Sequence, residues 1–319
     1  MHANARHPLA SLEEVATAAM EAAERGALPE AEQLATRALD IAERVPASAA
    51  RDRSVARALR ARGTSQRARG RYREAERSFV RARASAQSGF GAITLEVAEL
   101  ENDLGMTFKF DGRFARAEAA YSRAQVILES VPGVDPEDLA ALLHNLAGLA
   151  HARGDFAGAE PLARRAIELR SANGSHDGLG VLLDRSAHAA ILAGLGRHAE
   201  AEAAIRDLLP GLERIVGSDH PEVAVALNNL AAIVQGRGDL TLAESLYRRV
   251  VAIKTSALGE RSPGLAVPLN NLGTVLRRQG RLAEAAELYR RALDLLTGEV
   301  TDEHPNLLAI RSNLAIAAG

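Results

Sequence analysis

Polar side chains that could bind a ligand recur at a fixed spacing of 42 residues along this chain. Two such series lie seven residues apart, which places them two turns apart on one face of a helix. The first series is Arg60, Asn102, His144, Ser186, Asn228, Asn270 and Ser312, and the second is Arg67, Lys109, His151, Ala193, Gln235 and Arg277. Neither series contains a carboxylate, although the chain has 41 Asp and Glu residues. Donors spaced one per repeat can bond the carbonyl or carboxylate groups of an extended chain, so the series predict an acidic or neutral peptide-like ligand.

Ten members of the two series are the candidate binding residues. They are Arg60, Arg67, Asn102, Lys109, His144, His151, Asn228, Gln235, Asn270 and Arg277.

No constellation typical of catalysis accompanies these residues. The chain has no Cys, and His144 and His151 would lie about 10 Å apart along a helix axis, too far to bind one metal ion. Metalloprotease, phosphate-loop and Ser-nucleophile motifs are all missing from the sequence. We therefore expect a protein that is not an enzyme and that uses no metal or other cofactor.

A second set of columns with the same period indicates the elements that position the candidate residues. Glycines recur without a slip at Gly70, Gly112, Gly154, Gly196, Gly238 and Gly280. A Gly or Ala stands seven residues before each of them, and an aromatic residue often stands nine after. A left-handed glycine ends a helix, and a small residue such as Gly273 leaves room for a ring such as Tyr289 on a second helix. Each period therefore predicts an antiparallel helix pair, with Pro221, Pro263 and Pro305 opening first helices.

These columns resemble those of the tetratricopeptide repeat, most clearly in residues 220–232 (HPEVAVALNNLAA) and 243–252 (AESLYRRVVA). The period is longer than the usual 34 residues and is similar to that of kinesin light chains. The resemblance implies an all-α fold, a right-handed solenoid of antiparallel helix pairs. It also implies that the first helices line a concave groove for extended peptides or partner helices.

Three parts are expected along the chain: a disordered tail at residues 1–10, seven helix-pair repeats at 11–303 and a C-terminal capping helix at 304–319. The last helix is rather apolar for a cap, since it contains Leu307, Leu308 and Ile310. We therefore expect a monomer, or a weak homodimer formed through that helix.

The composition suits a folded, soluble protein, with 47% hydrophobic residues, 25% charged residues and a net charge of −2. No stretch approaches the roughly 18 apolar residues of a membrane span, and the N-terminus lacks the apolar core of a signal peptide. We expect a cytoplasmic location and no membrane partner. The excess of Arg over Lys suggests a bacterial gene.

The sharpest local bias is a basic stretch, Arg51 to Arg83, with twelve Arg against three acidic residues. It could be a solvated helix face, a docking surface for an acidic protein or a nucleic-acid patch. The net charge and the scarcity of aromatic residues for base stacking disfavour nucleic acid. The solvated face is the favoured interpretation.

The sequence as a whole favours a non-catalytic scaffold that binds another protein or peptide in its groove. The alternative is a regulatory sensor of the same fold, in which a bound peptide or small ligand changes the superhelix and so controls an effector. Irregular residues 161–190, beginning with a proline inside a predicted helix, favour that alternative.

Overall fold

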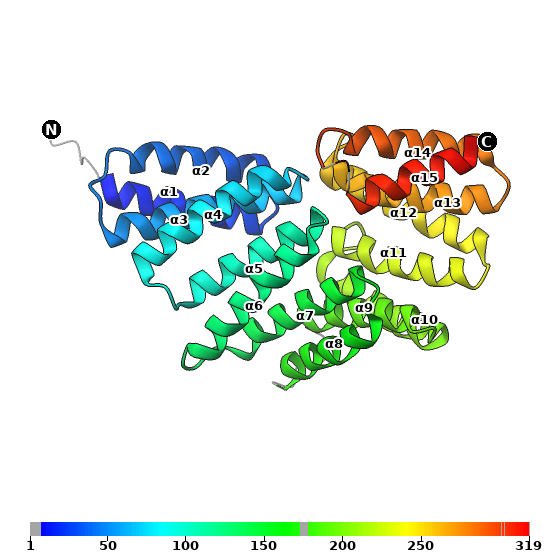
Figure 1. Ribbon diagram of the computed structural model, residues 1–319, viewed down its shortest axis with the longest axis horizontal. Helices are drawn as coiled ribbons and strands as arrows, with labels where there is room; N and C mark the ends of the chain where they lie inside the picture. Colours follow the sequence, from blue (N-terminus) through cyan, green and yellow to red (C-terminus); the bar gives the residue numbers. More distant parts are fainter. Residues whose placement is uncertain (1–7, 173–177, 301, 303, 319) are drawn as a thin grey trace. The chain divides into compact units, whose positions relative to one another are not determined.

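The computed structural model describes residues 8–172, 178–300, 302 and 304–318, which form fifteen α-helices, one 3-10 turn and no strand (Figure 1). In chain order the α-helices are α1 (Pro8–Glu24), α2 (Leu28–Ala42), α3 (Ala49–Ala68), α4 (Tyr72–Phe90), α5 (Leu95–Phe110), α6 (Phe114–Ser130), α7 (Pro136–Ala152), α8 (Phe156–Ser171), α9 (Leu179–Gly194), α10 (His198–Val216), α11 (Pro221–Gly236), α12 (Leu240–Leu258), α13 (Ala266–Arg278), α14 (Leu282–Leu296) and α15 (Pro305–Ala318). The fold is all-α, as predicted. The sequence predicts a disordered tail at residues 1–10. Residues 8–10 belong to α1, and residues 1–7 lie outside the described part.

Glycine turns close the helix pairs at the predicted positions. All six glycines of the 42-residue column have a positive φ, between 72° and 91°. After α13, the N–H of Gly280 donates to the carbonyl of Arg277 at 3.0 Å, and the N–H of Arg281 donates to that of Leu276 at 2.9 Å. These two bonds make a Schellman cap, in which the glycine takes the left-handed conformation. The predicted helix ends are confirmed.

The small residue of several pairs lies directly against an aromatic ring of the second helix. A Cβ atom on Gly273 would lie 2.8 Å from the ring of Tyr289, and one on Gly63 would lie 2.8 Å from the ring of Phe79. Both rings are completely buried. Because such distances are far below van der Waals contact, only glycine fits at these two positions without displacing the ring.

Side-chain caps and prolines begin several first helices. Pro221 and Pro305 are the first residues of α11 and α15, whereas Pro263 opens a 3-10 turn (Pro263–Leu265) that leads into α13. The residues before Pro221 and Pro263 are caps: the side chains of His220 and Ser262 each accept a hydrogen bond from a backbone N–H, both at 3.2 Å. The prolines fix the backbone angle that a helical first turn needs.

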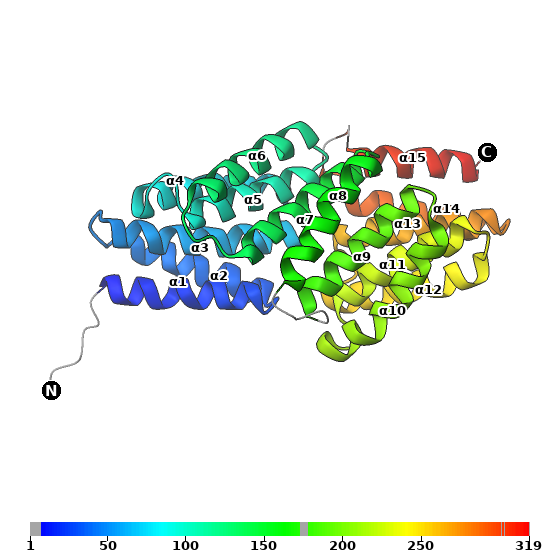
Figure 2. The same cartoon turned by 90° about the horizontal axis from the view of Figure 1, so that it is seen from below.

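The chain forms two compact units, residues 1–134 and residues 135–319. Within the first unit, the first helices of successive pairs, α1, α3 and α5, contact one another in order. Within the second unit, α7, α9, α11, α13 and α15 do the same. Each unit is therefore a stack of helix pairs in chain order, with one layer of first helices and one of second helices, and Figure 2 gives a second view of both stacks.

The last helix, α15, covers the end of the second unit with one face only. Leu307 and Ile310 are buried against α13 and α14. Leu308 and Ile316 lie on the other side and are 50% and 57% exposed. The helix thus shields the apolar edge of the last pair and presents some apolar surface of its own.

Candidate functional site

All ten candidate binding residues lie on first helices, and all are half-buried. The first unit carries Arg60 and Arg67 on α3 and Asn102 and Lys109 on α5. The second unit carries His144 and His151 on α7, Asn228 and Gln235 on α11, and Asn270 and Arg277 on α13. The candidate residues of the two units have different partners.

In the first unit, both candidate arginines are already ion-paired. Arg60 pairs with Glu99 and, at 2.8 Å, with Asp103, while Arg67 also pairs with Asp103 at 2.8 Å. Burial alone would raise the pKa of the Asp103 carboxyl, but the two guanidinium groups outweigh it and hold that pKa below its usual range. The positive charge expected from Arg60 and Arg67 is therefore neutralised within the unit.

Lys109 is a half-buried cation on α5, on the same face as Asn102. Its ammonium group lies 5.1 Å from the centre of the Phe110 ring. Burial and the nearby Arg67 guanidinium lower the pKa of Lys109 to about 8. Lys109 is therefore mostly charged at pH 7 and loses its charge at mildly alkaline pH.

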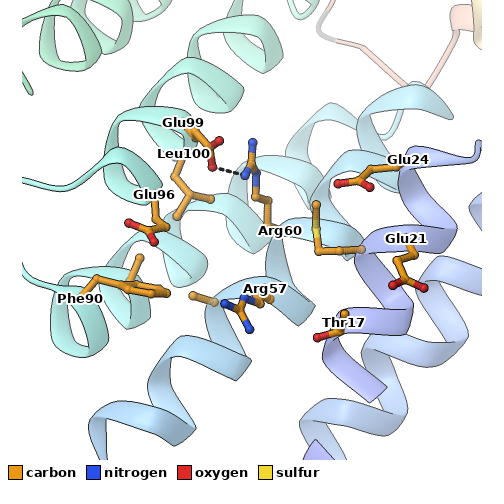
Figure 3. Close-up of a pocket in the computed structure, with 12 residues that line it drawn as sticks. Thr17, Glu21, Glu24, Arg57, Arg60, Phe90, Glu96, Glu99 and Leu100 are labelled. Atoms are coloured by element: carbon orange, nitrogen blue, oxygen red, sulfur yellow. Dashed lines mark hydrogen bonds and ion pairs between the residues drawn. The ribbon is translucent and has the colours of Figure 1, made fainter. Parts of the chain in front are cut away.

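A pocket of about 440 Å³ opens beside Arg60, between α1, α3, α4 and α5 (Figure 3). Its acidic lining residues are Glu21, Glu24, Glu96 and Glu99, and its basic ones are Arg57 and Arg60. Figure 3 shows Glu99 bonded to Arg60 on one side of the pocket and Glu21 and Glu24 on the other. Four carboxylates against two guanidinium groups give this pocket a negative balance, which does not suit an acidic ligand.

No pattern in the sequence predicts this pocket. Glu21 and Glu24 belong to the first helix pair, whose glycine, Gly26, lies 44 rather than 42 residues before the next one in the column. The pocket also takes Phe90 from the end of α4, a helix that contributes nothing to the two polar series.

In the second unit, the two candidate histidines have structural contacts. His144 Nδ1 lies 2.6 Å from the Asp184 carboxylate, which also pairs with Arg170 at 2.7 Å. Asp184 is only 1% exposed. The ring of His151 packs edge-on against Phe156, with the centroids 5.3 Å apart. These contacts fix α7 against α8 and α9 and leave the histidines less available than their position in the series suggests.

The asparagines of the second unit form a ladder that crosses from one first helix to the next. The Asn271 amide donates to the Asn228 side-chain oxygen at 3.1 Å, and the Asn313 amide donates to that of Asn270 at 2.9 Å. One step earlier, the Asn229 amide donates to the Ser186 hydroxyl at 3.3 Å. The ladder fixes the orientation of Asn228 and Asn270, whose oxygens point to the next helix. The donors of this ladder, Asn229, Asn271 and Asn313, are not among the ten predicted residues, although each directly follows a member of the first series.

Four side chains on α11 and α13 keep hydrogen-bond donors that no other described residue accepts. The Nδ2 groups of Asn228 and Asn270 have no acceptor, since only their oxygens are used in the ladder. Gln235 uses its oxygen to accept from the Tyr247 hydroxyl at 3.2 Å, and its Nε2 group is likewise without an acceptor. Arg277 has no ion pair within the described ranges, and its Nε is buried without a hydrogen-bond partner. The buried Nε of Arg277 is costly unless a ligand accepts from it. The three amide groups lie on half-buried residues, where they can donate to a ligand in place of water.

The described residues contain no group of three or more His, Asp or Glu residues arranged to hold a metal ion. None of their helices has the length and apolar character needed to cross a membrane.

Comparison with known proteins identifies the repeat. A tetratricopeptide repeat model matches residues 96–172, 183–256, 222–298 and 264–319. No curated protein matches the chain in sequence.

Several solved structures share the fold at low sequence identity. A Rap protein complexed with competence and sporulation factor is 15% identical, with a TM-score of 0.68, over 96% of this chain and 85% of its own. NprR in complex with its cognate peptide NprX is 12% identical, with a TM-score of 0.64, over 97% and 83%. BtubC from P. vanneervenii is 23% identical, with a TM-score of 0.51, over 71% and 90%.

These likenesses establish the architecture, and the family match covers well over half of the chain. The matched segments contain five of the six glycine turns, from Gly112 to Gly280, together with Gly273 and the ladder of asparagines. The fold is an all-α solenoid, and the chain belongs to the tetratricopeptide repeat family.

Proposed function

We propose that the chain is a non-catalytic scaffold that binds an extended peptide segment or a partner helix on the first helices of its second unit. The observation that carries this proposal is the set of unused donors on α11 and α13, from Asn228, Gln235, Asn270 and Arg277. Amide and guanidinium donors held in a fixed orientation are suited to the carbonyl groups of an extended chain.

Of the acidic and neutral ligands that the sequence predicts, the neutral one has more support. Arg60 and Arg67 are neutralised by Glu99 and Asp103, so they offer little to a carboxylate. On α11 and α13, three of the four unused donors are uncharged amides, and Arg277 is the single cation among them. A mostly neutral segment with one acceptor for Arg277 fits this set.

The alternative function is a regulatory sensor of the same fold. Rap and NprR, which share the fold, have been crystallised with competence and sporulation factor and with the peptide NprX. Within residues 161–190, α8 contains Pro161, and residues 173–177 lie outside the described part. A change in the radius of gyration on peptide binding, measured by small-angle X-ray scattering, would favour the sensor over the scaffold.

The arrangement of the chain is part of the proposal. We take α1 to α14 as seven repeats and α15 as a cap, in a cytoplasmic protein that is a monomer or a weak homodimer. Leu308 and Ile316 support the dimer, since α15 exposes both of them.

The test is a peptide-display selection on the intact chain, followed by affinity measurements with two matched double variants. Asn228→Ala with Asn270→Ala removes two ladder bonds and two unused donors. Asn271→Ala with Asn313→Ala removes the same two ladder bonds but keeps the donors. Fluorescence anisotropy of a selected ten-residue peptide should show about tenfold weaker binding to the first variant, roughly the value of one lost hydrogen bond per site.

The second variant should bind the peptide within about threefold of the unchanged chain, since it loses only orientation. Circular dichroism should show equal helicity for both variants. Equal losses of affinity would mean that the donors do not contact the peptide, and unchanged affinity in both would remove this surface from consideration.

A further inference from the structure

The basic stretch Arg51 to Arg83 divides into two groups when its partners are known. Seven of its arginines have an acceptor among the described residues; they are Arg51, Arg53, Arg60, Arg67, Arg69, Arg71 and Arg83. The other five have none in the described ranges; they are Arg57, Arg62, Arg73, Arg77 and Arg81. Six of the seven are ion-paired with a carboxylate, while Arg53 donates to the backbone carbonyl of Gly89. Half of the twelve charges are therefore neutralised within the described part of the chain, and the rest are not.

Three of the five arginines without a partner line one small cavity. Arg62 reaches it from α3, and Arg77 and Arg81 reach it from α4. The cavity has a volume of about 180 Å³, and Arg77 and Arg81 are exposed at its edge. Two like charges four residues apart on a helix repel each other and destabilise it slightly, so this arrangement has a cost that intramolecular contacts do not offset.

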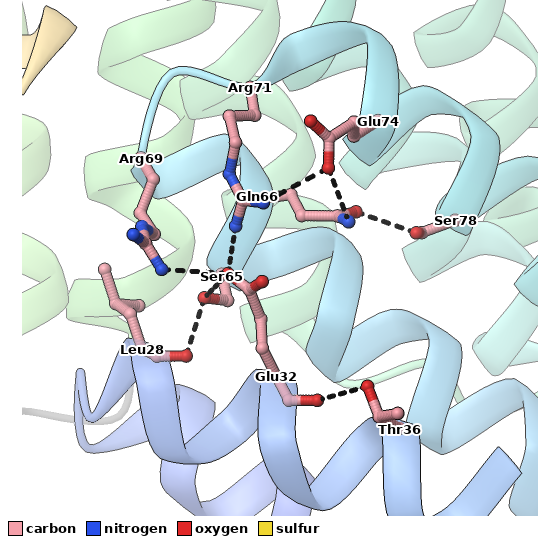
Figure 4. Close-up of polar contacts among 9 residues, drawn as sticks. All are labelled: Leu28, Glu32, Thr36, Ser65, Gln66, Arg69, Arg71, Glu74 and Ser78. Atoms are coloured by element: carbon pink, nitrogen blue, oxygen red, sulfur yellow. Dashed lines mark hydrogen bonds and ion pairs between the residues drawn. The ribbon is translucent and has the colours of Figure 1, made fainter. Parts of the chain in front are cut away.

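Two buried polar side chains complete the lining of the cavity. Gln66 is 2% exposed and Ser78 is 7% exposed. The Ser78 hydroxyl donates to the Gln66 oxygen at 2.7 Å, and the Gln66 amide donates to Glu74 at 3.3 Å. Figure 4 shows Gln66 extended between Ser78 and Glu74. This network fixes Gln66 and leaves the second N–H of its amide group for a ligand.

Glu74 is the one carboxylate among the residues that line the cavity, and it is shared with a neighbour. Arg71 donates to the same Glu74 oxygen that Gln66 uses, at 3.1 Å. The cavity therefore combines three guanidinium groups, an amide and a hydroxyl with a single carboxylate that already has two donors. Its balance is strongly positive for a space of this size.

The geometry points to a binding site for a phosphate monoester at this cavity, separate from the peptide surface proposed for the second unit. Guanidinium groups match the oxygens of a phosphate group and bond them in pairs. A compact dianion suits a small cavity with three converging cations better than an extended acidic segment does, because the segment spreads its charge over many residues. The monoester could belong to a small phosphorylated molecule or to a phosphorylated side chain of a partner protein.

Nucleic acid fits the surroundings less well, because the nearby aromatic rings are unavailable for stacking on bases. Phe79 is completely buried under Gly63. Tyr72 stacks on Phe110, with the ring centroids 6.3 Å apart.

Isothermal titration calorimetry at constant ionic strength tests the site with two probes, phenyl phosphate and a short peptide containing one phosphoserine. The variant Arg77→Gln with Arg81→Gln removes two of the three cations. The control variant is Arg290→Gln with Arg291→Gln, which removes two exposed arginines of α14 that have no ion pair within the described ranges. We expect the first variant to bind at least about tenfold more weakly, and the control to stay within about twofold.

Since Arg77 and Arg81 are exposed, the variant should keep its helicity and its unfolding temperature. Tighter binding of the phosphopeptide than of phenyl phosphate would identify a phosphorylated partner, and the reverse order a small molecule; both results support the site. No binding of either probe, equal losses in the two variants, or tighter binding of a single-stranded oligonucleotide than of either probe would overturn it.

Discussion

The two units of this chain carry the same series of polar residues, but a neighbouring position gives them different properties. Asp103 in the first unit stands 126 residues before Asn229 and 168 before Asn271, which are three and four periods of 42. Asp103 bonds Arg60 of the preceding repeat, and Asn271 bonds Asn228 of the preceding repeat, 43 residues back in both cases. The contact is thus the same in position and different in chemistry.

The difference determines what each surface can offer a ligand. A carboxylate accepts the donors of the arginine and neutralises it, so the first unit keeps little for a ligand. In the second unit, Asn271 and Asn313 donate to the oxygens of Asn228 and Asn270, so the Nδ2 groups of Asn228 and Asn270 stay unused. A series of polar residues along a solenoid therefore predicts a binding surface only when the residue that follows each member of the series is considered as well.

The largest effect is expected from converting the first unit to the chemistry of the second. Asp103→Asn leaves Arg60 with Glu99 as its remaining carboxylate and leaves the half-buried Arg67 with none. It should lower the free energy of unfolding by about 3 kcal/mol. A carboxyl whose pKa is lower in the folded state stabilises the fold above its unfolded pKa, and this stabilisation is lost as the pH falls through the folded value. Urea unfolding at pH 7 and at acidic pH measures both effects.

The variant should therefore lose part of the acid-side pH dependence together with its stability. A loss below about 1 kcal/mol at pH 7 would mean that Asp103 contributes no more than an exposed ion pair does, and the contrast between the units would be much weaker.

A packing substitution in the second unit should have the next largest effect. Ala243 is completely buried in α12, and Ala243→Leu should force helices apart and cost about 1–3 kcal/mol by overpacking. Ala252→Leu, at an exposed position of the same helix, is the control and should change stability by less than about 0.5 kcal/mol. Thermal unfolding followed by circular dichroism compares the stability of the two variants. An unchanged stability in Ala243→Leu would mean that Ala243 is not packed against a neighbouring helix.

The reciprocal exchange should remove ligand binding from the second unit. In Asn271→Asp, the new carboxylate can only accept, so it should engage the Nδ2 group of Asn228 and take that donor from the ligand. We expect about tenfold weaker binding of a display-selected peptide by fluorescence anisotropy. Ser245→Asp adds the same charge at an exposed position of α12 and should leave the affinity unchanged; equal effects would point to charge rather than to the ladder.

The smallest effect is a change in alkaline pH dependence at Lys109. The pKa of Lys109 is about 8 in the folded chain, below its ordinary value, so the unfolded chain binds more protons above pH 8 and stability rises with pH there. Lys109→Met should reduce this rise in stability between about pH 8 and 10. Burial also lowers the pKa of Lys254, so part of the rise should remain in the variant. Urea unfolding across that range measures the slope, and an unchanged slope would contradict the burial of a charged Lys109.

Much of the fold could be predicted from the sequence because its determinants are local and periodic. A glycine such as Gly280 ends a helix by its own backbone conformation, and Gly273 indicates the ring of Tyr289 by its lack of a side chain. Helical phase alone places Asn228 and Gln235 on one face of α11. These features need no knowledge of which repeats touch.

The chemistry of the candidate site could be predicted only in part, because it depends on contacts between repeats. Arg60 looks like a free cation in the sequence, and its neutralisation by Asp103 requires a contact 43 residues away. The same offset joins Asn271 to Asn228. The signal was present, in the residue that follows each member of the first series, but its meaning depends on the stacking of first helices.

The central claim is that a ligand uses the unused amide donors of α11 and α13. Nuclear magnetic resonance of the side-chain amides, during titration with a display-selected peptide, observes these groups directly. Peptide binding at these donors should produce large shifts for Asn228, Gln235 and Asn270, and none for the side-chain amide of Asn102 in the first unit. Shifts confined to the first unit or to α15, with the amides of α11 and α13 unmoved, would contradict it.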